Sequence, residues 1–304
     1  MTHVVKWKNF IIMPILISSL CITALFLLAS ELKDAFILGV RLAVGSILPS
    51  VFPFMILADY MSASISKISR RLVERISRRL GISSQGVSLL LIGLLCGFPV
   101  GARTVANAYL RGTISREECE RLCAVANAPS PVFVISGIGL IRGSIVEGVL
   151  LYASVVCSAL ICTAVFPGLE HFSPISDENQ GQNFDISDSI KRAGNASITI
   201  CAFVIFFSMV NSLVKKLLPS PYLSAIVCCF LEIGNAAKTL KETALPQNIS
   251  LGLCGFSLGF SGLSVLLQSF AFIPPEISRK RIVFTKLLQG AIAFILCLGA
   301  ASIT

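Results

Sequence analysis

Long apolar stretches recur along the whole chain and constrain its fold more than any other feature. Most approach the roughly 20 residues that a helix needs to cross the hydrocarbon core of a bilayer. The stretches are 10–30, 35–60, 87–110, 122–140, 144–168, 193–213, 221–237, 249–273 and 282–303. Charged residues are only 13% of the chain, whereas soluble domains carry about a quarter. We therefore predict an all-α, polytopic membrane helix bundle with about eight or nine spans.

The basic residues lie mainly in the links between apolar stretches, as the positive-inside rule describes. The link at 67–80 has six positive charges and one negative, with apolar residues every four positions. It is typical of an amphipathic helix on the cytoplasmic surface or of a solvated cytoplasmic loop. With a cytoplasmic N-terminus and an odd number of spans, the acidic link at 170–188 lies outside. The net charge of +9 therefore indicates a lipid bilayer as partner and no nucleic acid.

Signals for metal, cofactor or catalytic chemistry are missing from the sequence. Most of the 11 cysteines stand singly in apolar stretches, where cysteine packs as a small hydrophobe, and the two histidines lie in links. The motifs of zinc proteases, serine hydrolases and nucleotide-binding loops are absent. We expect no metal, no cofactor and no enzyme activity.

A short motif occurs twice. The run Leu95-Cys-Gly-Phe-Pro-Val-Gly101 returns as Leu253-Cys-Gly-Phe-Ser-Leu-Gly259, and under the topology above the two copies run in opposite directions. This pattern is typical of inverted repeats with broken or re-entrant helices, which many transporters have. We therefore divide the chain into an N-terminal transmembrane helix (1–34), a first repeat half (35–170), an extracytoplasmic acidic link (171–192) and a second repeat half (193–304).

The first copy of the motif offers a place to bind an anion. Gly97 and Pro99 disfavour a continuous helix. A helix that begins near Pro99 would present free N–H groups, and Arg103 follows one turn later. In the alternative, Gly97 and Gly101 form a helix-packing face, while Arg103 snorkels to the membrane surface or pairs with a glutamate.

A second break is predicted near Asn127. Ser115 and Glu118 have the spacing of a capping box, which starts a helix that two nearby prolines end soon after Asn127. Asn127 and Ser130 then either contact a solute or lie in a surface loop, since irregular backbone at membrane depth is tolerated only inside the protein or along a cavity.

The second half adds polar residues at comparable places. Glu232 and Asn235 are one turn apart near the end of an apolar run, and a glycine-rich face leads to Gly262. Gln268 either contacts a solute or forms a hydrogen bond between helices. The complete set of candidate substrate-binding residues is Gly97, Pro99, Gly101, Arg103, Asn127, Ser130, Glu232, Asn235, Ser261, Gly262, Ser264 and Gln268.

These motifs, in this order, resemble the YlbJ-like sporulation integral membrane proteins, a group with the nucleoside recognition or Gate domain. The resemblance is carried by residues 97–103, 111–122, 131–139, 231–235 and 262–268, and it spans most of 35–300. It implies a multi-pass bacterial cell membrane protein, with the forespore membrane as one location, and for some members movement of dipicolinate. At 127–131 the family leads us to expect a second asparagine followed by a small residue and Gly-Pro, but this chain has Ala128 in place of the second asparagine and an extra Pro129.

Together, the motifs and the resemblance lead us to expect a transporter for a small organic anion, with dipicolinate as one candidate. The alternatives are a non-transporting sporulation scaffold and a nucleoside transporter. A homo-oligomer is compatible with each of these.

Overall fold

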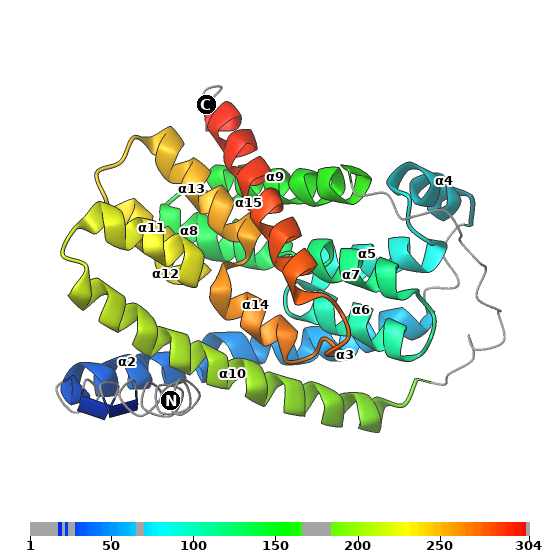
Figure 1. Ribbon diagram of the computed structural model, residues 1–304, viewed down its shortest axis with the longest axis horizontal. Helices are drawn as coiled ribbons and strands as arrows, with labels where there is room; N and C mark the ends of the chain where they lie inside the picture. The colour runs from blue at the N-terminus through cyan, green and yellow to red at the C-terminus, as the bar shows by residue number, and fades with distance from the viewer. Residues whose placement is uncertain (1–17, 20–21, 24–27, 65–69, 166–183, 302–304) are drawn as a thin grey trace, which may run out of the picture.

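The computed structural model describes residues 18–19, 22–23, 28–64, 70–165 and 184–301 (Figure 1). All regular elements within these residues are helices, which turns and short loops connect. The elements are α2 (Ala29–Leu42), η1 (Ala43–Ile47), α3 (Leu48–Ser64), α4 (Arg70–Leu80), α5 (Ser84–Cys96), α6 (Val100–Leu110), α7 (Arg116–Val125), η3 (Val132–Ile138), α8 (Gly139–Arg142), α9 (Ile145–Val165), α10 (Ile186–Leu217), α11 (Pro221–Leu231), α12 (Ile233–Glu242), α13 (Gln247–Phe260), α14 (Gly262–Phe270) and α15 (Arg279–Ala301). The all-α prediction is confirmed. Most of the predicted N-terminal helix and of the acidic link lies outside the described residues.

Within the described residues, four helical stretches are long and apolar enough to cross a membrane: Ile145–Val165, Ile186–Leu217, Gln247–Phe270 and Arg279–Ala300. A fifth is added if α4 and α5, which meet at 92°, count as one bent span. The expected eight or nine spans are not confirmed, because several other apolar stretches form shorter helices such as Pro221–Leu231. Apolar composition sets where a helix is stable in lipid, but it does not show where that helix is interrupted.

The predicted amphipathic helix is present as α4. Val73 is buried, while Arg75, Arg78 and Arg79 are exposed. The apolar side of α4 packs against α5 and α9, so the basic side remains available to solvent or to lipid headgroups.

Two groups of helices enclose the middle of the molecule. In Figure 1, α10 runs the length of the lower side beside α2 and α3, and α9, α13 and α15 pack together above. The glycine face of α13 serves this packing: a Cβ at Gly255 would lie 2.5 Å from Cys297 Sγ, and one at Gly259 2.9 Å from the Gln289 carbonyl. The glycine face of α13 therefore receives a neighbouring helix, α15.

Each half of the described chain contains two broken helix pairs followed by a long helix. In the first half α5 and α6 break at 97–99, α7 and η3 break at 126–131, and α9 follows. In the second half α11 and α12 break at Glu232, α13 and α14 break at Ser261, and α15 follows.

The repeated seven-residue motif does not mark equivalent places in this order. Its first copy spans the α5–α6 break, whereas its second copy lies inside the continuous helix α13. The repeat led us to expect a second broken segment around Gly255, and this expectation is wrong. Without a proline, the glycines there lower helix stability but remove no hydrogen bond, and their contact with α15 holds the helix intact.

Candidate functional site

The first two breaks touch each other. Gly97 ends α5 at φ 83°, a conformation that favours glycine, and a Cβ there would lie 2.7 Å from the backbone nitrogen of Ser130. Ser130 Oγ accepts a hydrogen bond from the Phe133 N–H (3.3 Å) where η3 begins, and Pro99 immediately precedes α6. The break between α5 and α6 therefore lies directly against the break between α7 and η3.

The two breaks of the second half have the same relation. Gly262, at φ 62°, starts α14, and a Cβ there would lie 3.2 Å from the Leu231 carbonyl and 3.4 Å from the Glu232 backbone. Glu232 is the N-cap of α12, because its carboxylate accepts hydrogen bonds from the Gly234 N–H (2.8 Å) and from the Asn235 N–H (2.7 Å) and side-chain amide (2.9 Å). In this conformation both Glu232 and Asn235 serve to start a helix.

Asn127 and Ser261 join the two halves. Ser261, a non-glycine residue at φ 75°, donates from Oγ to the Asn127 carbonyl (3.3 Å), and Asn127 Nδ2 donates to Ser269 Oγ (2.8 Å). Both Asn127 and Ser261 are completely buried. The predicted break at Asn127 is therefore inside the protein rather than in a surface loop, which is the arrangement that allows irregular backbone at membrane depth.

A lysine completes this junction. Lys286 of α15 is completely buried, and its Nζ donates to the Asn127 carbonyl and to Gln289 Oε1, each at 3.0 Å. It follows Arg279, the first residue of the span, by seven positions, or about 10 Å along a helix axis. Within the described residues no carboxylate forms an ion pair with it. We call Asn127, Ser261, Ser269, Lys286 and Gln289 the Lys286 centre.

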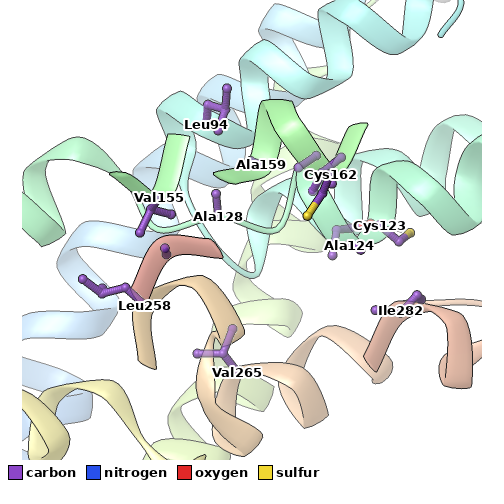
Figure 2. Close-up of a cluster of buried hydrophobic side chains, with 14 of the residues drawn as sticks. Leu94, Cys123, Ala124, Ala128, Val155, Ala159, Cys162, Leu258, Val265 and Ile282 are labelled. Atoms are coloured by element: carbon purple, nitrogen blue, oxygen red, sulfur yellow. Dashed lines mark hydrogen bonds between the residues drawn. The ribbon is translucent and has the colours of Figure 1, made fainter. Parts of the chain in front are cut away.

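The Lys286 centre is embedded in apolar side chains. Ile282 and Val265 stand one turn before Lys286 and Ser269 on their helices, and Ala128 follows Asn127; all three belong to the main apolar core (Figure 2). Cys162 of α9 belongs to the same core. In such surroundings a charge without an opposite charge is costly, which makes an intramembrane lysine a candidate functional group.

Arg103 has a partner that the sequence analysis did not identify. Its guanidinium forms an ion pair with Asp59 of α3 (3.4 Å), and the same carboxylate oxygen accepts from Ser189 Oγ (2.9 Å) and pairs with Arg192 (3.4 Å). Arg103 and Asp59 are both buried, whereas Arg192 is more open. The cluster therefore joins α3, α6 and α10. One alternative in the sequence analysis gave Arg103 a glutamate as its partner, and the observed partner is an aspartate.

The remaining candidates make local or packing contacts. Gln268 Nε2 donates to Ser264 Oγ (3.2 Å), so these two buried residues pair within α14. Gly101 and Gly93 both face the Ala126 carbonyl so closely that a Cβ at either position would overlap it. Gly101 thus acts in helix packing, and this contact holds α5 and α6 against the chain just before Asn127.

The start of α7 fixes the position of the Asn127 break. Ser115 caps the helix by accepting from the Glu118 N–H (3.2 Å), as expected, but the Glu118 carboxylate accepts from the Ser83 N–H (2.7 Å) instead of reaching back to Ser115. Arg121 donates to the carbonyls of Gly81 (2.7 Å) and Thr163 (3.0 Å). The capping box is therefore only half formed, because its glutamate connects α7 to the start of α5.

The sequence analysis missed Asp59, Lys286, Gln289 and Ser269. Lys286 had a usable signal, since it stands within the apolar stretch 282–303, where a charge is costly. Gln289 lies one turn later on the same helix. Asp59 also stands in an apolar stretch, 35–60, but nothing in the sequence matches it to Arg103, 44 positions away, and Ser269 carries no comparable signal.

The chain is similar to one characterised protein by sequence. It is 23% identical over 295 residues to the sporulation integral membrane protein YlbJ of Bacillus subtilis strain 168, which covers 81% of this chain and 72% of the relative. No family model matches the chain, and no solved structure does. The likeness supports the sporulation-protein part of the predicted resemblance, while the Gate-domain part stays a prediction. With the apolar helices described above, it identifies the chain as a membrane protein distantly related to a sporulation integral membrane protein.

Proposed function

We propose that the protein is a membrane permease for a small organic anion, with dipicolinate as the first candidate substrate. The observation that carries the proposal is the junction of the helix breaks at a buried polar centre inside an apolar core. Transporters commonly place their substrate sites at such discontinuous helices, where backbone groups and a few side chains replace the water around the solute.

The two halves of the chain supply the symmetry that this mechanism uses. Each half has the same order of broken pair, broken pair and long helix, and a hydrogen bond from Ser261 to Asn127 joins a break of one half to a break of the other. We propose that 35–170 and 193–304 are inverted repeats, and that a movement of one against the other exposes the junction to each side of the membrane in turn. The choice of dipicolinate rests on the resemblance to sporulation membrane proteins.

Arg103 takes a different part from the one that the sequence first indicated. Because it is paired with Asp59, we assign it to holding α6 against α3 and α10. Asn127, Ser261 and the helix ends around Gly97 and Gly262 then line the path, with Ser264 and Gln268 adjacent on α14.

Uptake into proteoliposomes tests this function. Vesicles with the purified protein should accumulate radiolabelled dipicolinate faster than protein-free vesicles, and unlabelled dipicolinate should compete while uridine should not. Uptake of uridine with no uptake of dipicolinate would instead establish the nucleoside alternative.

A deletion strain separates transport from a scaffold. In the spore-former that the proposal implies, loss of a permease leaves spores that form but lack dipicolinate. An early block in spore morphology, with dipicolinate movement intact, would favour the scaffold and contradict the proposal.

A further inference from the structure

Two other buried cationic side chains have carboxylate partners, but Lys286 has only neutral partners. Arg103 pairs with Asp59, and Arg142 pairs with Glu147 and also donates to Ser250 Oγ (3.1 Å). Lys286, buried deeper than either, contacts only a backbone carbonyl and a neutral amide through the hydrogen bonds of its Nζ. A lysine ammonium has three N–H donors, so one remains after these two bonds.

The amides around Lys286 also have unused groups. Among the described residues Gln289 Nε2 and Asn127 Oδ1 are buried and have no hydrogen-bond partner. Both amides are held in place by their other atoms: Gln289 Oε1 accepts from Lys286, and Asn127 Nδ2 donates to Ser269. Buried amide groups without partners are unusual, because each one costs the hydration that it has lost.

The unused N–H groups of Lys286 and Gln289 are both donors, so they fit a ligand group that accepts hydrogen bonds. We propose that the Lys286 centre binds one carboxylate group, whose oxygens accept hydrogen bonds from Lys286 Nζ and Gln289 Nε2. The proposal rests on the proposed function only in treating the owner of this carboxylate as a transported substrate. A carboxylate supplies the single negative charge that balances one ammonium.

Arg103 and Lys286 then have separate roles. Arg103 has a carboxylate partner in Asp59, whereas Lys286 has none among the described residues. A dicarboxylate such as dipicolinate therefore uses one carboxylate at Lys286. Picolinate, which has a single carboxylate on the same ring, tests the Lys286 centre by itself.

Equilibrium binding to the purified full-length chain provides the test, with radiolabelled dipicolinate and picolinate as probes. The decisive comparison is between Lys286→Gln and Lys280→Gln, which remove the same charge from the same helix. Lys280 is exposed and stands just six positions earlier. Loss of a buried hydrogen-bonded charge partner should raise the Kd of Lys286→Gln about 30-fold or more for both probes, while Lys280→Gln should bind as the unaltered protein does.

One further measurement and one further variant distinguish loss of the site from a folding defect. Lys286→Gln should be at least as resistant to heating as the unaltered protein when no anion is present, because an unbalanced buried charge is gone. Gln289→Met keeps the charge of Lys286 but removes the Nε2 donor together with the Oε1 acceptor of Lys286, and should raise Kd about tenfold. Unchanged binding of both probes by folded Lys286→Gln, or absence of binding by the unaltered protein, would overturn the proposal.

The carboxylate site and the permease function can be refuted independently of each other. Lys286-dependent binding of picolinate in a protein that takes up no anion into vesicles would support the carboxylate site and refute the permease. Uptake of dipicolinate by Lys286→Gln at the unaltered rate would support the permease and refute the site.

Discussion

Replacing Asp59 by asparagine should be among the most damaging single changes outside the Lys286 centre. The change leaves Arg103, whose side chain is only 6% exposed, without its negative partner, and it weakens the contacts of Ser189 and Arg192 to the same oxygen. Breaking a buried ion pair from one side costs about 3–5 kcal/mol. The 3.4 Å separation between Arg103 and Asp59 is longer than that of a strong charge-assisted bond, so we expect about 3 kcal/mol.

The double variant Asp59→Asn with Arg103→Met shows whether this cost comes from the unpaired charge. It removes both buried charges together and should therefore recover about 2 kcal/mol relative to the sum of the two single changes. The matched control is Asp188→Asn on α10, whose pair with Lys191 is exposed and 4.0 Å long, and which should change stability by at most about 0.5 kcal/mol.

Heating the detergent-purified variants and measuring the fraction that stays monodisperse gives their apparent melting temperatures. Asp59→Asn should melt well below the control, and the double variant should melt above Asp59→Asn. The double variant should also keep dipicolinate uptake, because Arg103 is assigned to packing. Additive losses of stability, or a stable double variant without uptake, would refute the reasoning.

Two further changes test the packing of the breaks. Gly101→Ala should cost about 1–3 kcal/mol, because the added methyl group overlaps the Ala126 carbonyl, whereas Gly194→Ala, with open space around its Cβ, should gain up to about 1 kcal/mol; their melting temperatures should therefore move in opposite directions. Glu232→Ala should cost about 1 kcal/mol through loss of the α12 cap, and Glu232→Gln, which keeps one accepting oxygen, should cost less in the same assay; equal losses would contradict the capping role.

The sequence predicted those helix breaks that have a local cause. Pro99 cannot donate an N–H, and Pro129 and Pro131 follow Asn127, so the ends of α5 and α7 could be placed without knowledge of the fold. The break at Ser261 has no such signal. A serine at positive φ is held there by its surroundings, including the bond to the Asn127 carbonyl and the close approach of Gly262 to Leu231.

Span count and side-chain partners depended on tertiary structure. Two half-helices and one whole helix can have the same apolar length, so the stretch 221–237 could not be divided at Glu232 from hydropathy. Arg103 was identified as a candidate site residue, but Asp59, 44 positions earlier, could be matched to it only through the packing of α3 on α6. Lys286 is a charged residue within an apolar stretch, which marks it as a candidate. Its neutral partners became visible only once Asn127 and Gln289 were placed around it.

The central claim is that the helix breaks form an anion site at Lys286. An experimental structure of the protein with 4-iodopyridine-2,6-dicarboxylate, whose iodine is visible by anomalous scattering, tests it most directly. We expect one ligand carboxylate about 3 Å from Lys286 Nζ and from Gln289 Nε2. The ring of the ligand should lie between the α7–η3 and α13–α14 breaks. A ligand bound at Arg103 with the Asp59 pair opened, and Lys286 still bonded only to Asn127 and Gln289, would contradict it.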